Sequence, residues 1–131
     1  MLISIKGGLV RDFMLKNVLT CNKNRTVRDC FKILFRTHAG AIIVTDKECR
    51  VKGIITVQDL VRAVAQNIPL NSSLDRVMTK NVYTINEDAS FEQAKKIIRF
   101  HRIRFIPVLD MNQKLTGLVS IKRLADEIFE S

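Results

Sequence analysis

The sequence lacks long apolar stretches, and no uninterrupted run of hydrophobic residues exceeds about five residues. A helix that spans a bilayer needs about 20 such residues, so no membrane segment is predicted. The beginning of the chain has no long apolar centre and no small-residue cleavage site, so we read no signal peptide there. The expected location is therefore the cytoplasm.

Cysteine is scarce and unpatterned. Cys21, Cys30 and Cys49 are odd in number and widely spaced, and they form no C-x-x-C pair and no Cys/His cluster with zinc spacing. This pattern predicts free thiols in a reducing compartment. We expect Cys30 in the core, because it lies on a helical apolar face, and Cys49 in a polar turn.

Residue combinations that carry catalysis are also missing. The sequence shows no nucleophile next to a base, no carboxylate pair and no metal cluster. His38 and His101 have no acid or cysteine nearby in sequence, which favours a surface or packing role for both. We expect no enzyme activity, no metal site and no obligatory cofactor.

Positive charge is in excess, with a formal net charge of +9 on 131 residues. This balance suggests an anionic partner, but it does not choose between nucleic acid, a membrane surface and a phosphate ligand. Basic and apolar residues alternate over 99–104, as expected for a helix end, where cations are favourable, followed by a loop. Nucleic acid is not the partner we expect, although charge alone leaves it open.

The chain is organised around a short apolar strand that runs into a helix, over residues 51–60. The same pattern returns over 115–124, where Gly117 follows Gly53 by 64 residues. At this one offset, identical residues meet along both halves of the chain: Met14, Lys16, Asn17, Val18, Thr20, Asn22, Lys32, Ile33, Ile42, Val44, Asp46, Gly53 and Leu60 meet Met78, Lys80, Asn81, Val82, Thr84, Asn86, Lys96, Ile97, Ile106, Val108, Asp110, Gly117 and Leu124.

Each half predicts a β-α-β-β-α unit. Thr26-x-x-Asp29 and Ser90-x-x-Gln93 are helix caps in front of helical apolar periodicity, and all-apolar strands follow at 41–44 and 105–109. The expected organisation is a lead-in at 1–12, a first repeat at 13–65, a linker at 66–73 and a second repeat at 74–131. The fold class is α/β (α+β). Because neither repeat hides its own sheet, we expect the repeats to pack face to face with approximate two-fold symmetry.

This doubled unit resembles a pair of cystathionine-β-synthase (CBS) domains, a Bateman module. The residues that carry the resemblance are 75–82 at the start of a repeat, 106–110 in the central strand and 53–59 at the strand-helix junction. The match covers roughly residues 10 to 128. The resemblance implies a non-catalytic regulatory module whose cleft between the two repeats binds an adenosyl ligand, such as AMP, ADP, ATP or S-adenosylmethionine.

The resemblance also implies site residues. Asp59 would accept from the ribose hydroxyls, since an ionised carboxylate only accepts, and Thr56 would bind phosphate. Arg104 would pair with phosphate through its guanidinium fork. The remaining expected contacts come from two strands: Val82, Tyr83, Thr84, Ile106 and Pro107. Thr56-x-x-Asp59 is also a helix-start signature, so these side chains can serve as a cap and as ligand contacts.

A second, related site departs from the family pattern. Arg123 stands where the first site has Asp59, and arginine cannot accept from a hydroxyl. Gly40 and Ile43 stand where the first site has Arg104 and Pro107. We expect this site to be empty or to hold polyphosphate or another anion. Its expected residues are Val18, Thr20, Ile42, Ser120 and Arg123.

The resemblance further implies a homodimer formed through helices and an effector domain that is fused or associated. Two alternatives stay open beside the sensor: a ligand-free dimerisation or scaffold module, and a nucleic-acid-associated regulator. The candidate dimer contacts are Leu60, Val61, Val64, Leu124 and Ile128.

Overall fold

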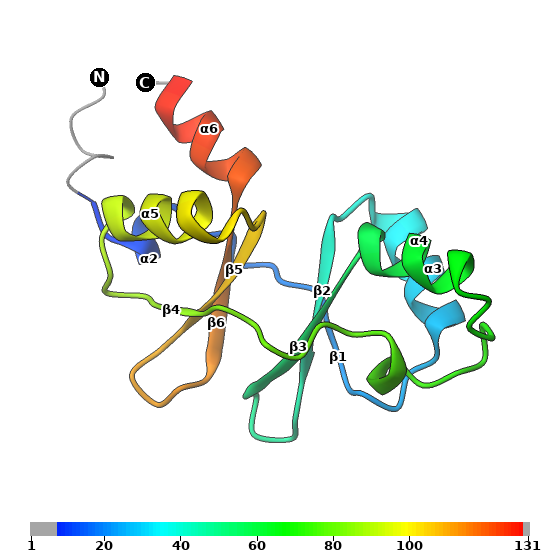
Figure 1. The fold of residues 1–131 in the computed structure, drawn as a ribbon. Coiled ribbons are helices and arrows are strands. Elements are labelled where there is room, and N and C mark those ends of the chain that lie inside the picture. The colour runs from blue at the N-terminus through cyan, green and yellow to red at the C-terminus, as the bar shows by residue number, and fades with distance from the viewer. Residues whose placement is uncertain (1–7, 130–131) are drawn as a thin grey trace. The chain divides into compact units, whose positions relative to one another are not determined.

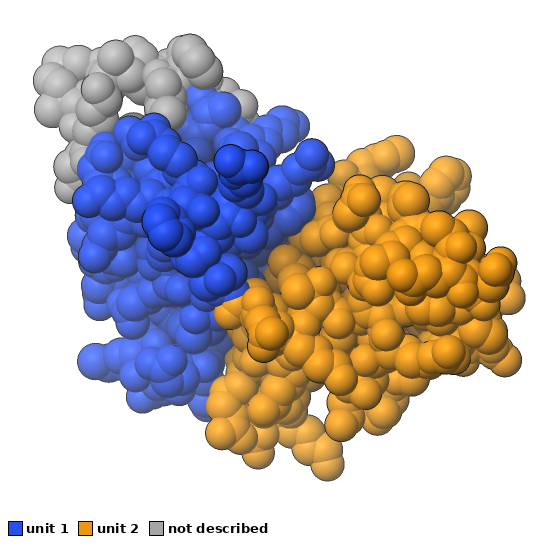
Figure 2. All heavy atoms as spheres, viewed as in Figure 1, with its two compact units in different colours: residues 1–18, 83–131 blue, residues 19–82 orange. Residues whose placement is uncertain are grey.

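The structure is a computed structural model that describes residues 8–129, with side chains described to residue 125. The chain divides into two compact units, shown in separate colours in Figure 2. Unit 2 contains residues 19–82, and unit 1 contains residues 1–18 together with 83–131. Each unit holds a three-stranded sheet with helices, which confirms the mixed α and β fold with two repeats. None of the described helices is long and apolar enough to cross a membrane.

In unit 2 the sheet has the strand order β1-β2-β3, with β1 parallel to β2 and β2 antiparallel to β3. The helices α3 and α4 contact each other and the strands β2 and β3 (Figure 1). The elements are β1 (Thr20–Cys21), α3 (Val27–Thr37), β2 (Ala41–Thr45), β3 (Val51–Thr56), α4 (Val57–Ala65) and a 3-10 turn (Leu74–Arg76).

Unit 1 repeats this plan in the order β4-β5-β6, again with one parallel and one antiparallel pair. Both sheets carry an irregularity at the end of the central strand, after Val44 in β2 and after Val108 in β5. The elements are α2 (Val10–Phe13), β4 (Ile85–Asn86), α5 (Phe91–His101), β5 (Phe105–Leu109), β6 (Leu115–Ser120) and α6 (Ile121–Phe129).

The predicted helix caps are confirmed. The Thr26 hydroxyl accepts from the Asp29 backbone N–H at 3.1 Å, and the Asp29 carboxylate accepts from the Thr26 N–H at 3.2 Å. Ser90 and Gln93 exchange the same two bonds at 3.1 and 2.8 Å. Because each pair satisfies two backbone donors that the first turn leaves open, α3 and α5 begin at equivalent positions.

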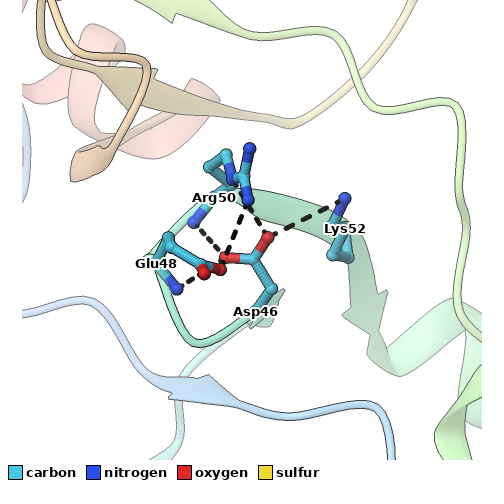
Figure 3. Close-up of polar contacts among 4 residues, drawn as sticks. All are labelled: Asp46, Glu48, Arg50 and Lys52. Atoms are coloured by element: carbon cyan, nitrogen blue, oxygen red, sulfur yellow. Dashed lines mark hydrogen bonds and ion pairs between the residues drawn. The ribbon is translucent and has the colours of Figure 1, made fainter.

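Hydrogen bonds to one carboxylate close the β2–β3 hairpin (Figure 3). The Asp46 carboxylate accepts from the backbone N–H groups of Glu48 and Arg50, each at 2.9 Å, and from Arg50 Nε at 3.1 Å. These bonds, with the N–H of Arg50 the largest contribution, lower the pKa of Asp46. Asp110 closes the β5–β6 hairpin with the same two backbone bonds, to Asn112 at 2.8 Å and Lys114 at 3.0 Å. The predicted polar turns are therefore tight hairpins.

The compact units do not coincide with the sequence repeats, because the segment in front of each first strand packs onto the elements of the other repeat. In unit 1, Leu15 and Leu118 exchange two backbone hydrogen bonds of 2.8 and 2.9 Å. In unit 2, Ile54 and Thr79 exchange two such bonds of 3.0 Å. The buried Val10, at 0% exposure, belongs to the same core as the second repeat.

Gly53 and Gly117 permit these crossings. A Cβ atom on Gly53 would lie 2.7 Å from Met78 Sδ and 3.0 Å from the Thr79 carbonyl oxygen. A Cβ atom on Gly117 would collide with Met14 and would lie 3.0 Å from the Leu15 carbonyl oxygen. The glycine that opens each strand-helix junction is therefore needed for close approach of the crossing segment.

Candidate functional site

The structure places Thr56 and Asp59 together at the start of α4 in unit 2. The Asp59 carboxylate Oδ2 accepts from the Thr56 backbone N–H at 2.9 Å and from the Thr56 hydroxyl at 3.2 Å. Asp59 is only 7% exposed, and every buried side-chain polar atom described has a partner. The cap role predicted for this pair is thus present in the fold.

The other carboxylate oxygen of Asp59 is occupied as well. Oδ1 accepts from the hydroxyl of Thr79 at 3.1 Å and from Arg62 Nη2 at 3.1 Å. Arg62 Nη2 also donates to the Val77 carbonyl at 2.9 Å. Four donors therefore surround one carboxylate, so a ligand hydroxyl can reach Asp59 only by replacing one of them.

The strand residues expected on the opposite side of the ligand are divided between the units. Val82 ends unit 2, whereas Tyr83 and Thr84 begin the part of unit 1 that leads into β4. Tyr83 is 46% exposed, and its ring stacks on the His101 ring with centroids 3.8 Å apart and planes at 21°. The packing role expected for His101 is consistent with this stack.

The side chains of β5 alternate between two faces. Ile106 is completely buried in the core of unit 1, so its side chain is committed to that core. Pro107 follows on the other face and pairs with Leu118 of β6. Ile42 in β2, expected in the second site, is likewise completely buried in the core of unit 2.

Pro107 leaves a backbone acceptor without its donor. At the equivalent position in unit 2, the Ile43 N–H donates to the Leu19 carbonyl at 2.9 Å. Proline has no N–H, so Pro107 cannot make the same bond to the carbonyl of Tyr83, which stands 64 residues after Leu19. No donor contacts this carbonyl among the backbone groups of residues 8–129 and the side chains described to residue 125.

Arg104 is exposed in front of β5, and its carbonyl accepts from the Ile121 N–H at 2.9 Å. Its side chain lines a groove between α5 and α6. In the described residues no carboxylate pairs with its guanidinium, which leaves the charge available to an anion.

In the expected second site, Ser120 and Arg123 are both engaged in hydrogen bonds within unit 1. The buried Ser120 hydroxyl accepts from the Arg123 backbone N–H at 3.0 Å and caps α6. Arg123 Nε donates to the Phe13 carbonyl at 2.8 Å, so the guanidinium is engaged within unit 1. Val18 is half-buried, and Thr20 is exposed in β1.

Two cysteines of unit 2 lie against each other. Cys21 in β1 packs against the core that contains the fully buried Cys30 of α3. A hydrogen bond from the Cys30 thiol lowers the pKa of Cys21, and the same contact together with burial raises the pKa of Cys30. Cys49 is exposed in its turn, as predicted.

Sequence reasoning missed Thr79 and Arg62, which complete the contacts of Asp59. Arg62 had a usable signal, because an acid and a base three positions apart on a helix are neighbours. Thr79 had no such signal, because it meets Asp59 only where the segment after the linker crosses β3 at Ile54.

A model of the CBS domain family matches the chain twice, over residues 10–66 and 74–130. An uncharacterized 17.7 kDa protein of Acidianus ambivalens is 34% identical over 113 residues, which cover 86% of this chain and 68% of that protein. A homoserine O-acetyltransferase of Methanosarcina acetivorans is 28% identical over 89% of this chain, which spans only 21% of that enzyme. Among solved structures, the CBS domain pair of protein MJ0100, in complex with 5′-methylthioadenosine and S-adenosyl-L-methionine, gives a TM-score of 0.83 at 27% identity. That likeness covers 91% of this chain and 94% of the other.

Proposed function

The chain belongs to the CBS domain family, and we propose that it is a regulatory module that senses an adenosyl ligand of the AMP/ADP/ATP or S-adenosylmethionine class. The observation that carries this proposal is the likeness to the MJ0100 domain pair, whose structure contains two adenosyl compounds. The chemistry of Asp59 and of the Tyr83 carbonyl supports it. No catalytic role is proposed for any residue.

In the proposed site, Asp59 accepts from the ribose hydroxyls while Thr56 binds phosphate. Since the carboxylate already has four donors, a ribose hydroxyl would take the place of the Thr79 or Thr56 hydroxyl. Val77 and Thr79 belong to a segment that is attached to α4 by hydrogen bonds to Arg62 and Asp59. Loss of the bond between Asp59 and Thr79 would weaken this attachment. Ligand binding would in this way change the balance between two states of the module, as a sensor requires.

On unit 1, the free carbonyl of Tyr83 suits the exocyclic amine of adenine, which is a donor. Thr84, the apolar ring of Pro107 and the main chain at Ile106 would border the base, and Val82 would contribute from the end of unit 2. The Arg104 guanidinium would pair with a phosphate or carboxylate of the ligand. The second site has neither the acid nor the proline, and Arg123 is engaged with Phe13, which supports an empty second site.

The test is titration calorimetry of the purified chain with 5′-methylthioadenosine, S-adenosylmethionine, AMP, ADP and ATP. The decisive variant is Pro107→Ile, which copies Ile43 of unit 2 and restores the donor to the Tyr83 carbonyl. We expect this variant to stay folded and to weaken binding at least about tenfold. The Tyr83 carbonyl would then accept from the new backbone N–H and would no longer be available to the adenine amine. Absence of binding by every ligand would overturn the sensor in favour of the ligand-free scaffold.

We also propose that two copies pair through helices and act on an effector domain, fused or associated. Three apolar side chains of α4 support the pairing, because they stay between 53% and 58% exposed: Val57, Val61 and Val64. Leu60 and Leu124, expected as contacts, are instead buried at 2% and 4% in the cores of their own units, so they are unavailable. Ile128 lies outside the described side chains. The homoserine O-acetyltransferase relative supports a fused effector, since the matching region is a small part of it.

A further inference from the structure

A groove of about 580 Å³ runs between α5 and α6 on unit 1. Its floor is apolar: Ile98 and Leu124 are 7% and 4% exposed, and Ile121, at the edge, is 49% exposed. Its described lining residues are Lys95, Ile98, Arg99, Arg102, Ile103, Arg104, Ile121, Leu124 and Ala125. Four of them are cations, and this described lining contains no acid.

Among the side chains described, to residue 125, the positive charge of the groove is largely uncompensated. Lys95 pairs with Glu92 at 3.4 Å. Over residues 8–125, by contrast, no carboxylate pairs with the guanidinium of Arg99, Arg102 or Arg104. Cations gathered beside a low-dielectric apolar floor produce a stronger field than the same charges spread over a surface.

This character belongs to unit 1 and is not a requirement of the fold. At the 64-residue offset, Lys95, Arg99, Arg102 and Arg104 correspond in unit 2 to Phe31, Phe35, His38 and Gly40. Phe35 is 81% exposed there. The positions that are basic on unit 1 thus hold two phenylalanines, a histidine and a glycine on unit 2, so the two faces suit different partners.

We propose that the α5–α6 groove docks an acidic amphipathic helix of a partner protein. Lys95 and Arg99 lie four residues apart on one face of α5, and Arg102, the left-handed residue that ends this helix, lines the same groove, so the three form a row of basic residues. A facing helix with acids at the same spacing can pair along the whole row while its apolar side chains enter the groove. A compact anion would meet only part of the row.

A second copy of this chain is a poorer occupant. Each of α3, α4 and α5 contains a single acidic residue, and α6 contains Asp126 and Glu127 next to each other. None of these helices therefore carries acids three or four residues apart, as the basic row of the groove requires. Pairing of two copies at this groove would also bring basic side chains against each other, unlike pairing at the apolar side chains of α4.

The probe is a fluorescent 18-residue synthetic helix with leucines on one face and glutamates on both borders. A peptide of the same composition in scrambled order and a peptide with lysine in place of glutamate serve as controls. Binding is measured by fluorescence anisotropy for the wild type and for Arg99→Glu/Arg102→Glu. The matched variant is Arg28→Glu/Arg36→Glu, which makes the same change of net charge at exposed positions of α3. Arg104 is left intact, so the proposed adenosyl site is not altered.

We expect the wild type to bind the amphipathic acidic peptide, and the groove variant to bind it at least about tenfold more weakly, because two charge-assisted contacts are reversed. The α3 variant should stay within about twofold of the wild type. Equal losses in both variants, or equal binding of the scrambled peptide, would reduce the effect to net charge and overturn the proposal. Self-association of the wild type that the groove variant abolishes would assign the groove to a second copy instead.

Discussion

Asp59 accepts a hydrogen bond from the hydroxyl of Thr79 at 3.1 Å, although the two residues stand 20 positions apart. Together with the bond from Arg62 to the Val77 carbonyl, this contact fastens the segment after the linker to α4. Unit 1 fastens the equivalent segment with Arg123, which donates to the Phe13 carbonyl at 2.8 Å. Both units therefore hold the same backbone position, and only unit 2 uses a buried carboxylate to do so.

Replacement of Asp59 by alanine should lower the free energy of unfolding by about 2–4 kcal/mol, because it removes a cap and deprives Thr56, Arg62 and Thr79 of their shared charged acceptor. Urea denaturation of the ligand-free protein measures the change. Asp75→Ala is the matched control, since Asp75 is exposed and makes only a surface pair with Lys80 at 3.5 Å; its expected cost is below about 1 kcal/mol. Equal stability of Asp59→Ala and wild type would show that the network contributes nothing to folding.

Local patterns predicted the elements well, because their causes are local. The caps at Thr26 and Ser90 and the turns at Asp46 and Asp110 are each closed by hydrogen bonds that span at most four residues. The repeat at a fixed offset then transferred each prediction from one half to the other.

Local patterns could not predict which segments of the chain make up each compact unit. Leu15 pairs with Leu118 across more than a hundred residues, and Thr79 pairs with Ile54 in the same geometry. Because the segments in front of both first strands are alike in sequence, periodicity does not say which repeat each segment joins. The contacts that depend on this choice, including Thr79 to Asp59, therefore appear only in the folded chain.

Gly53→Ala should destabilise the fold by about 1–3 kcal/mol, the usual cost of overpacking. The added Cβ would meet Met78 Sδ at 2.7 Å and the backbone oxygen of Thr79 at 3.0 Å, and only the first can move easily. Thermal unfolding followed by circular dichroism detects the loss. The control is Gly40→Ala, at an exposed position where the second repeat carries Arg104. An unchanged melting temperature for Gly53→Ala would refute the close crossing.

Cys21 should remain reactive at lower pH than an ordinary thiol, because the thiol of Cys30 stabilises its thiolate and lowers its pKa. In a Cys49→Ser background, the rate of alkylation is followed as the pH falls from about 9 to about 7. A lowered pKa means that a larger fraction of Cys21 is thiolate at each pH, so the midpoint of the rate profile should lie at lower pH than in a protein without the Cys30 thiol. Cys30→Ala removes the donor and should move this midpoint to higher pH. The contact is disproved if both proteins show the same profile.

The exposed apolar row of α4 should hold two copies together. Val61→Glu places a charge at the middle of the row formed with Val57 and Val64, and a charge buried without a partner opposes association. Sedimentation velocity over a range of protein concentrations should show a dimer for the wild type. For the variant, the dissociation constant of the dimer should be at least about tenfold higher.

Gln58→Glu gives the control for that experiment, since it adds the same charge to the same helix at an exposed position outside the row. We expect it to associate as the wild type does, because a charge at a solvated position costs little. If Gln58→Glu and Val61→Glu weaken association equally, charge and not the apolar row governs pairing. If the wild type sediments as a monomer at every concentration, the row on α4 is free to receive a different protein, and α4 joins the α5–α6 groove as a surface for an effector.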